Sequence, residues 1–287
     1  DNVRRLRFEP GVKFALVQSD VYQAFFDQGE GGNAEARQLV SPLRLIMPLY
    51  NEEIYFIARA DSPLQFVHEI KDARLNVGPL GSGTAMSATT LYRQLFGTAS
   101  PEATTSYLSN EDALVKLTGD KSVDVVVVVA GQPAKLLADM KAEARGLIKL
   151  LRFDAEHPSS KAALGTYVRA TIRAASYPNL LSEELPGLAV QAYLVTYDYN
   201  RSATVSTMTR FARSLCQNFA TLQAKGHPKW REVQLALPEL KAGWRYYPPV
   251  HKELASCIAR GPARSPAAPR PTTTKPCNQQ ERVLGLC

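Results

Sequence analysis

The chain has 287 residues, of which 45% are hydrophobic and 21% are charged. This length gives room for one large or two ordinary domains, and this balance is typical of a folded protein rather than a disordered one. The longest uninterrupted apolar stretch, 125–130, is far shorter than the about 20 residues that cross a bilayer, so the sequence predicts no transmembrane segment.

The formal net charge is +7, from 34 Lys and Arg against 27 Asp and Glu. The last segment, 258–287, contains five basic residues and one acidic residue, and so carries more than half of this charge. A DNA-binding domain is expected to carry its positive charge as a patch on the folded part. The distribution therefore favours a basic tail on a nearly neutral body and argues against nucleic acid as a partner.

Short apolar runs alternate with amphipathic helical patterns along most of the chain. Several runs are continuous, as expected for parallel strands covered on both faces, and helical spacing of apolar residues follows between them. We expect strands at 13–18, 43–48, 54–59, 75–78, 124–130, 148–153 and 190–196, and helices at 88–96, 164–175 and 205–222. This order predicts an α/β fold with mostly parallel sheets.

The folded body is expected to end near Ala259. The following segment, 261–276, contains five prolines and is typical of an extended linker or stalk. The four cysteines would form disulfides in an exported protein and stay thiols in the cytosol. We expect Cys216 to pair with Cys257 and Cys277 with Cys287, and the alternative for Cys216 is an ordinary buried thiol. The sequence contains no Cys-x-x-Cys pair and no His beside a cysteine, so the cysteines do not indicate a metal site.

The segment 75–96 is the most informative for binding. A strand-like run ends at Gly78, a turn follows with Gly81, Ser82, Gly83 and Thr84, and a helix then begins. The amides of such a helix N-terminus, with two hydroxyls and the positive end of the dipole, would bind a carboxylate, phosphate or sulfate. The segment is not a P-loop, because Thr84 stands where the lysine belongs. The alternative is that Ser82 or Thr84 only caps the helix.

Three other segments place polar residues after or between strands. Gln18, Ser19 and Asp20 follow a strand, so Ser19 or Asp20 could be a helix N-cap, or Gln18 and Asp20 could lie at the ligand-binding edge of a sheet. The stretch 124–133 ends a buried strand in a glycine turn, and 49–52 lies between two strands.

Catalytic motifs are lacking in the sequence. The four histidines are scattered, and neither a His-Glu-x-x-His nor a Gly-x-Ser-x-Gly pattern occurs. The sequence predicts no enzyme, no metal site and no cofactor, and Asp20 is the one candidate for an acid or base.

Taken together, these segments resemble one known family. VQSDV (17–21), PLYNEE (48–53), YFIARADSPLQFVHEIKDARLNVGPLGSGT (55–84), VDVVVVVAGQP (123–133) and AGWRYYPP (242–249) occur in this order. The set resembles the TAXI-type solute-binding proteins of TRAP transporters, over roughly residues 2–254. The resemblance implies a type II periplasmic-binding fold, in which two lobes enclose the solute. It implies a first lobe of 1–61 and 188–256, a second lobe of 62–187, and a tail of 257–287.

The resemblance also implies the residues of the ligand site. From the first lobe, Gln18, Ser19 and Asp20 would face the cleft, with Tyr50 on the same wall. From the second lobe, the turn Gly81, Ser82, Gly83 and Thr84 would hold the carboxylate of the solute, with Gly131 and Gln132 beside it. Family members bind small carboxylates such as glutamate, so Asp20 is expected to pair with the ammonium group of an amino-acid solute.

Two departures from the family pattern bear on function. The family opens with a strand, a Gly-rich turn and a long helix, whereas DNVRRL at residues 1–6 resembles a stretch several dozen residues further on, so we expect that opening to be missing. The Pro-rich tail is also outside the pattern. The expected function is a periplasmic receptor that captures a glutamate-like or dicarboxylate solute for TRAP membrane permease subunits. The alternative is a sensory or scaffolding domain with this fold that acts through a protein partner.

Overall fold

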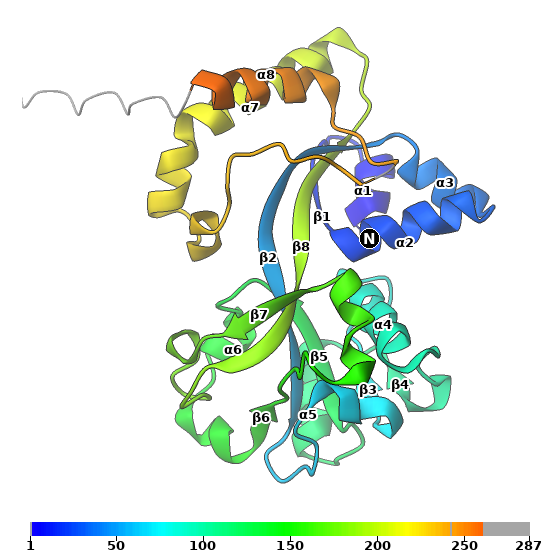
Figure 1. Ribbon diagram of the computed structural model, residues 1–287, viewed down its shortest axis with the longest axis vertical. Helices are drawn as coiled ribbons and strands as arrows, with labels where there is room; N and C mark the ends of the chain where they lie inside the picture. Colours follow the sequence, from blue (N-terminus) through cyan, green and yellow to red (C-terminus); the bar gives the residue numbers. More distant parts are fainter. Residues whose placement is uncertain (1, 242, 261–287) are drawn as a thin grey trace, which may run out of the picture.

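Two long strands join two lobes in the computed structural model, which describes residues 2–241 and 243–260 (Figure 1). These strands are β2 (Leu43–Arg59) and β8 (Leu185–Tyr197), and they pair antiparallel with one another. The expected Cys277–Cys287 pair and the Pro-rich tail lie outside the described residues.

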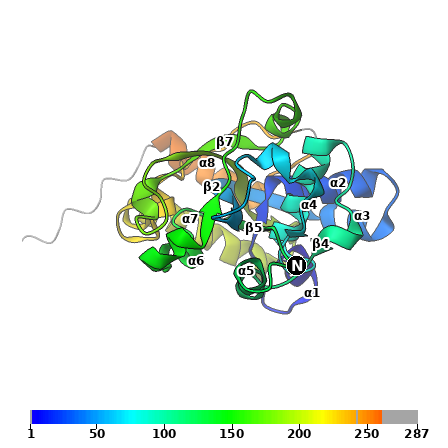
Figure 2. The same ribbon diagram turned by 90° about the horizontal axis from the view of Figure 1, so that it is seen from below.

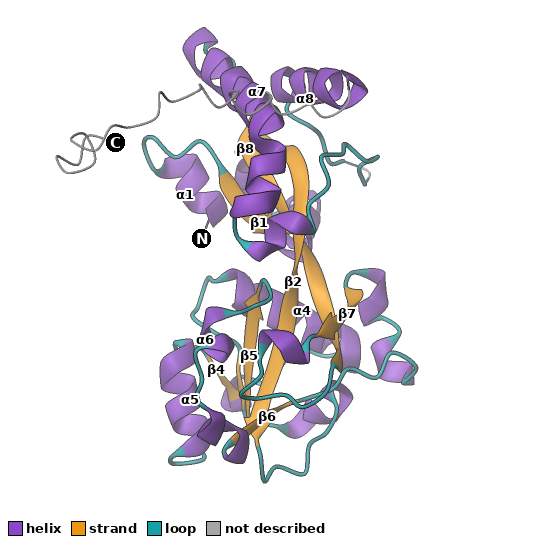
Figure 3. Ribbon diagram, turned by 90° about the vertical axis from the view of Figure 1, so that its left-hand side faces the viewer, coloured by secondary structure: helices purple, strands orange, loops and turns teal. Residues whose placement is uncertain are grey.

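The first lobe is a three-stranded sheet covered on both faces. β8 lies between β2 and a short strand, β1 (Ala15–Gln18). One face packs against α1 (Asn2–Phe8), α2 (Ser19–Glu30) and α3 (Ala34–Val40), and the other against α7 (Ser202–Lys225) and α8 (Pro248–Arg260) (Figure 1; α1, α7 and α8 also in Figure 3). Leu43 and Leu45 of β2 face the first group, while Ile46 and Met47 face the second. A short 3₁₀ turn, η7 (Pro228–Arg231), follows α7.

The second lobe extends the same sheet past β2. Its remaining strands are β3 (Leu75–Asn76), β4 (Thr105–Ser106), β5 (Val125–Ala130), β6 (Ile148–Leu150) and β7 (Val168–Ile172). Along β5, Val125 and Val127 pack towards α4 (Gly83–Phe96), whereas Val126 and Val128 pack towards α5 (Asn110–Thr118) and α6 (Lys135–Ala138). This alternation follows from the two-residue period of a strand and buries both faces of the sheet.

The sheet is mixed. The parallel pairings are β3 with β4 and β3 with β5, and the other pairings between described strands are antiparallel. The α/β class and the two-lobed arrangement agree with the sequence prediction, but the expected parallel direction is found only among these strands of the second lobe. Continuous Val and Ile runs reflect burial on both faces, and burial does not depend on strand direction.

Three predicted elements differ in the structure. The strands expected at 43–48 and 54–59 are one strand, β2, with a register irregularity between Pro48 and Asn51. The helix expected at 164–175 is wrong, because this stretch forms β7 between short 3₁₀ turns. Val168, Thr171 and Ile172 are β-branched and favour a strand when an edge such as that of β8 is available.

β2 gains a further neighbour inside the strand. Its pairing with β8 extends from Leu43 to Ile54, and residues 53–58 also pair with β5 of the second lobe. The expected boundary at 187/188 lies within β8. The division of the chain between lobes stays a prediction in its details.

A disulfide joins the two helices on the outer face of the first lobe. Cys216 of α7 is bonded to Cys257 of α8, with 6.4 Å between their Cα atoms, so this expected pair is confirmed. Arg213 and Glu253 form an ion pair between the same helices.

In the part of the chain that is described, no helix combines the length and apolar character needed to span a bilayer.

Candidate functional site

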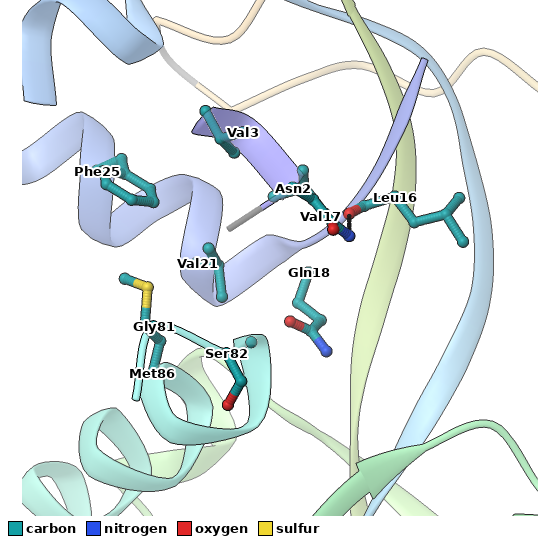
Figure 4. Close-up of a pocket in the computed structure, with 11 residues that line it drawn as sticks. Asn2, Val3, Leu16, Val17, Gln18, Val21, Phe25, Gly81, Ser82 and Met86 are labelled. Carbon is teal, nitrogen blue, oxygen red and sulfur yellow. Dashed lines mark hydrogen bonds between the residues drawn. The ribbon is translucent and has the colours of Figure 1, made fainter. Parts of the chain in front are cut away.

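The helices α2 of the first lobe and α4 of the second lie side by side (Figure 2). A cavity of about 240 Å³ lies where α2 meets the beginning of α4 (Figure 4). Its polar lining includes Asn2, Gln18 and Ser82, with the backbone of Gly81 and Gly83. The remainder of the lining is apolar and comes from both lobes: Val3, Leu16, Val17, Val21, Phe25 and Met86. Only some of the residues expected to bind the solute therefore line this cavity between the lobes.

The turn before α4 presents backbone amides towards this cavity. Gly78 and Gly81 have φ of +85° and +76°, a left-handed conformation that glycine adopts without steric cost. Ser82 is the N-cap, and its Oγ accepts a hydrogen bond of 3.0 Å from the amide of Ala85. The first amides of a helix lack partners within the helix, so Gly83 and Thr84 offer N–H groups at the positive end of the dipole. Capping and anion binding are compatible here, because the cap uses Ser82 as an acceptor.

Gln18 connects the two lobes at the cavity. Its Nε2 donates a hydrogen bond of 2.9 Å to Glu52 Oε2, and its Oε1 lies against Gly83. A Cβ atom at Gly83 would collide with this oxygen, so glycine is required for the close approach. The Gln18 side chain consequently lies beside the amides that would hold a carboxylate.

Asp20 lies behind the cavity rather than in its lining. Only 3% of this residue is exposed. Its Oδ2 accepts a hydrogen bond of 2.8 Å from the hydroxyl of Tyr167 in the second lobe, and its Oδ1 accepts one of 2.7 Å from the amide of Val21. Burial raises the pKa of the Asp20 carboxyl, against the opposing effect of these hydrogen bonds. Asp20 therefore links the lobes, and the expected contact with a solute ammonium group stays a prediction.

The expected N-cap at Ser19 or Asp20 is wrong. The helix begins one residue earlier than that interpretation requires, with Ser19 as its first residue and Gln18 at the N-cap. Gln18 makes no side-chain capping bond, because its amide group extends to Glu52 instead.

Two further residues expected in the site, Ser19 and Thr84, do not line the cavity. Thr84 lies beside Gly78, where its Cγ2 would be 3.1 Å from an added Cβ.

Tyr50, Gly131 and Gln132 gather in a second group. A Cβ at Gly131 would lie 3.4 Å from Tyr50 Cε2 and 3.2 Å from Cγ of Lys229. The amide of Gln132 donates to Glu53 Oε2 over 2.7 Å. These residues also lie outside the cavity lining. The structure thus brings Gln18 together with Gly81, Ser82 and Gly83, and brings the other three predicted residues to Lys229.

Lys229 of η7 was missed from the sequence. Its side chain is 0% exposed, and its Nζ donates hydrogen bonds of 2.7 Å to Glu53 Oε1 and to Glu232 Oε2. Glu232 in turn pairs with Arg173 after β7 over 2.8 Å. Lysine is almost never fully buried unless it is paired. The surrounding HPKWRE stretch is polar and indicates a surface turn, so no local signal identifies this ion pair.

Buried carboxyls accumulate where the lobes meet. Burial raises the pKa of Glu52 and of Glu53. The negative charges of Glu53 and Asp20 raise the pKa of Glu52 further, while the Gln18 hydrogen bond and Lys229 lower it. The junction is therefore electrostatically unfavourable when all three carboxyls are ionised.

These buried carboxyls make the stability of the fold depend on pH. The variant Glu52→Gln should weaken this dependence. A carboxyl whose pKa is raised on folding binds more protons in the folded state, so stability is lost as pH rises from the ordinary value of 4.5 through the folded-state value. Glu52→Gln keeps an acceptor for Gln18 but removes the charge. We expect the variant to gain stability over the wild type progressively as the pH rises above the ordinary value of 4.5 in urea unfolding.

The matched control is Glu184→Gln, which changes an exposed glutamate. Its unfolding free energy should follow the wild-type pH curve in parallel. Parallel curves for Glu52→Gln as well would show that the Glu52 carboxyl is not destabilised by folding.

Comparison with known proteins gives one family match. A family model described as the NMT1-like family matches residues 1–240. Solved structures similar to this chain include a TctC solute-binding protein from Polaromonas, at 16% identity, with 90% of this chain and 82% of that chain covered and a TM-score of 0.40. XAC2383 from Xanthomonas citri bound to ATP is similar at 10% identity, with 90% and 81% covered and a TM-score of 0.43.

The arginine-, lysine-, histidine-binding protein ArtJ from Geobacillus stearothermophilus is also similar. It has 10% identity, with 78% of each chain covered and a TM-score of 0.40. At these identities and TM-scores, the ligands named for these proteins carry no information about the solute of this chain.

Proposed function

This chain belongs to the NMT1-like family, and we propose that it is an extracytoplasmic receptor that captures a small carboxylate between its two lobes. We assign it a binding role and no catalytic one. In keeping with the TAXI-type resemblance of the sequence, the captured solute would pass to the membrane permease of a TRAP-type transporter. The same resemblance favours glutamate-like acids or dicarboxylates as the class of solute.

The observation that carries the proposal is the cavity at the beginning of α4. Residues of both lobes line it, so a change in the angle between the lobes would open or close it. The amide of Gly83 and the hydroxyl of Ser82 can donate hydrogen bonds to a carboxylate there. The Cys216–Cys257 disulfide supports a location outside the cytosol, because disulfides persist in oxidising compartments.

A second candidate is a sensory or scaffolding domain with the same fold. Contacts of the protein itself tie the lobes together near the cavity, namely the Asp20–Tyr167 hydrogen bond and the approach of Gln18 to Gly83. Such contacts favour a domain whose lobes hold a fixed angle and present one surface to a protein partner.

A thermal-shift experiment separates the two candidates. The wild type would be titrated with glutamate, glutamine, aspartate and 2-oxoglutarate, and with monocarboxylates. A ligand that binds only the folded chain raises the melting temperature in a saturable manner. Absence of any shift, in a chain that melts cooperatively, would contradict the receptor and favour the scaffold.

Gly83→Ala tests whether the cavity is the site of such a shift. The added Cβ would force Gln18 Oε1 away from its place beside the α4 amides, so we expect the solute affinity to fall at least about tenfold. Gly146→Ala is the matched control, because a Cβ there meets no atom within 4 Å. Equal affinities for both variants would place the solute elsewhere.

A further inference from the structure

We propose that the solute is a monocarboxylate with an apolar body and no ammonium group, which narrows the proposed function and rests on it. This class differs from the glutamate-like acids and dicarboxylates that the sequence resemblance favours. The inference comes from the walls of the cavity, from the polar groups near it that already have partners, and from its volume.

The walls away from the α4 turn are apolar. Val17, Val21 and Phe25 line the cavity from the first lobe, and Met86 faces them from the second (Figure 4). An apolar ligand body placed here would be removed from water without leaving polar atoms unpaired. Met86 is flexible and adapts to the shape of such a body.

A second carboxylate has no counter-charge in this cavity. Among the described residues of its lining, none has a charged side chain. One N–H of each side-chain amide nearby is already engaged, since Gln18 Nε2 donates to Glu52 and Asn2 Nδ2 donates to the carbonyl of Leu16 over 2.9 Å. A dicarboxylate would therefore lose the hydration of its far carboxylate without a positive charge to compensate it.

An ammonium group would be equally uncompensated. Asp20 is outside the lining, and both of its oxygens accept hydrogen bonds, from Tyr167 and from the amide of Val21. Glu52 is also outside the lining and accepts from Gln18. An amino acid would therefore have no counter-charge among the residues that line the cavity, and a buried unpaired charge is costly.

The volume favours a small solute. A cavity of about 240 Å³ is below the about 300–1,000 Å³ of sites for drug-sized ligands, so a small acid of about eight non-hydrogen atoms is chosen as the probe. 4-Methylpentanoate has this size. Leucine is the same molecule with an ammonium group, and glutarate is a straight-chain dicarboxylate with one more non-hydrogen atom, so the three compounds are close in size and differ in charge.

Isothermal titration of the full chain with these three compounds tests the inference. We expect the Kd of 4-methylpentanoate to be at least about tenfold lower than that of leucine or of glutarate. Equal or tighter binding of leucine, glutarate or glutamate would overturn the inference and leave the receptor function intact. Failure of every acid to bind a cooperatively melting chain would overturn both.

Met86→Lys tests the same inference at the wall of the cavity. A cation there should pair with the far carboxylate of glutarate, so we expect the preference between glutarate and 4-methylpentanoate to reverse. The control is Val115→Lys, which adds the same charge to an exposed position of α5 and should leave the preference unchanged. An unchanged preference in folded Met86→Lys would contradict the inference.

Val21→Thr provides a second variant in case Met86→Lys fails to melt cooperatively. Threonine keeps the shape of valine but adds a hydroxyl to the apolar wall. The affinity for 4-methylpentanoate should fall while that for glutarate does not. A fall of the same size for both compounds would count against an apolar solute.

Discussion

Replacing Lys229 with methionine is expected to lower the free energy of unfolding at neutral pH by about 3–5 kcal/mol. The ammonium group is fully buried and pairs with Glu53 and Glu232, so its removal leaves the buried Glu53 carboxylate without a counter-charge. The loss should be smaller at low pH, because Glu53 then becomes protonated. Urea unfolding at neutral and acidic pH measures both effects.

The companion variants separate charge from packing. Adding Glu53→Gln to Lys229→Met should recover part of the loss, because the uncompensated carboxylate is removed together with its partner. Lys161→Met is the matched control at an exposed lysine and should change stability by less than about 0.5 kcal/mol. A loss that is the same at both pH values, with no recovery in the double variant, would show that the ion pair does not stabilise this junction.

Removing the Cys216–Cys257 disulfide by double substitution to serine is the second large expected effect. The two residues are 41 positions apart, and a cross-link of this span lowers the conformational entropy of the unfolded chain. This effect stabilises the folded state by about 2–4 kcal/mol. The bond also joins α7 to α8, so its loss should favour separation of α8 from the first lobe. The expected result is a lower midpoint of urea unfolding than in the wild type.

Reduction of the wild type is the internal control for that variant. Reduced wild type should unfold at the midpoint of the double-serine variant, and the reductant should leave the variant itself unchanged. A variant that matches the oxidised wild type would show that the α7–α8 contact, with its Arg213–Glu253 ion pair, is sufficient without the bond.

The sequence predicted elements whose signals lie within one turn or one strand. The helix after Gly83 formed with Ser82 as its cap, and the apolar runs at 124–130 and 190–196 became β5 and part of β8. The α7 helix covers the predicted 205–222. Caps, helical spacing and continuous apolar runs depend on neighbouring residues, so they are readable without the fold.

Strand direction and the length of β2 required the tertiary structure. A run such as 43–48 is apolar whether its neighbour is parallel or antiparallel, and the polar residues at 51–53 interrupt the pattern although the strand continues. The stretch 164–175 has helical spacing but forms β7, because β8 offers a paired edge there. Tertiary pairing overrides local pattern in both cases.

By itself, the sequence determined the positions of the glycine turn before α4 and of Gln18 at the end of β1, which meet at the cavity. Only the tertiary structure decided what the polar groups around them do. Asp20 finds Tyr167 across 147 positions, and Lys229 finds Glu53 across 176. Buried polar groups must find partners wherever the packed lobes supply them, and a linear pattern does not contain that choice.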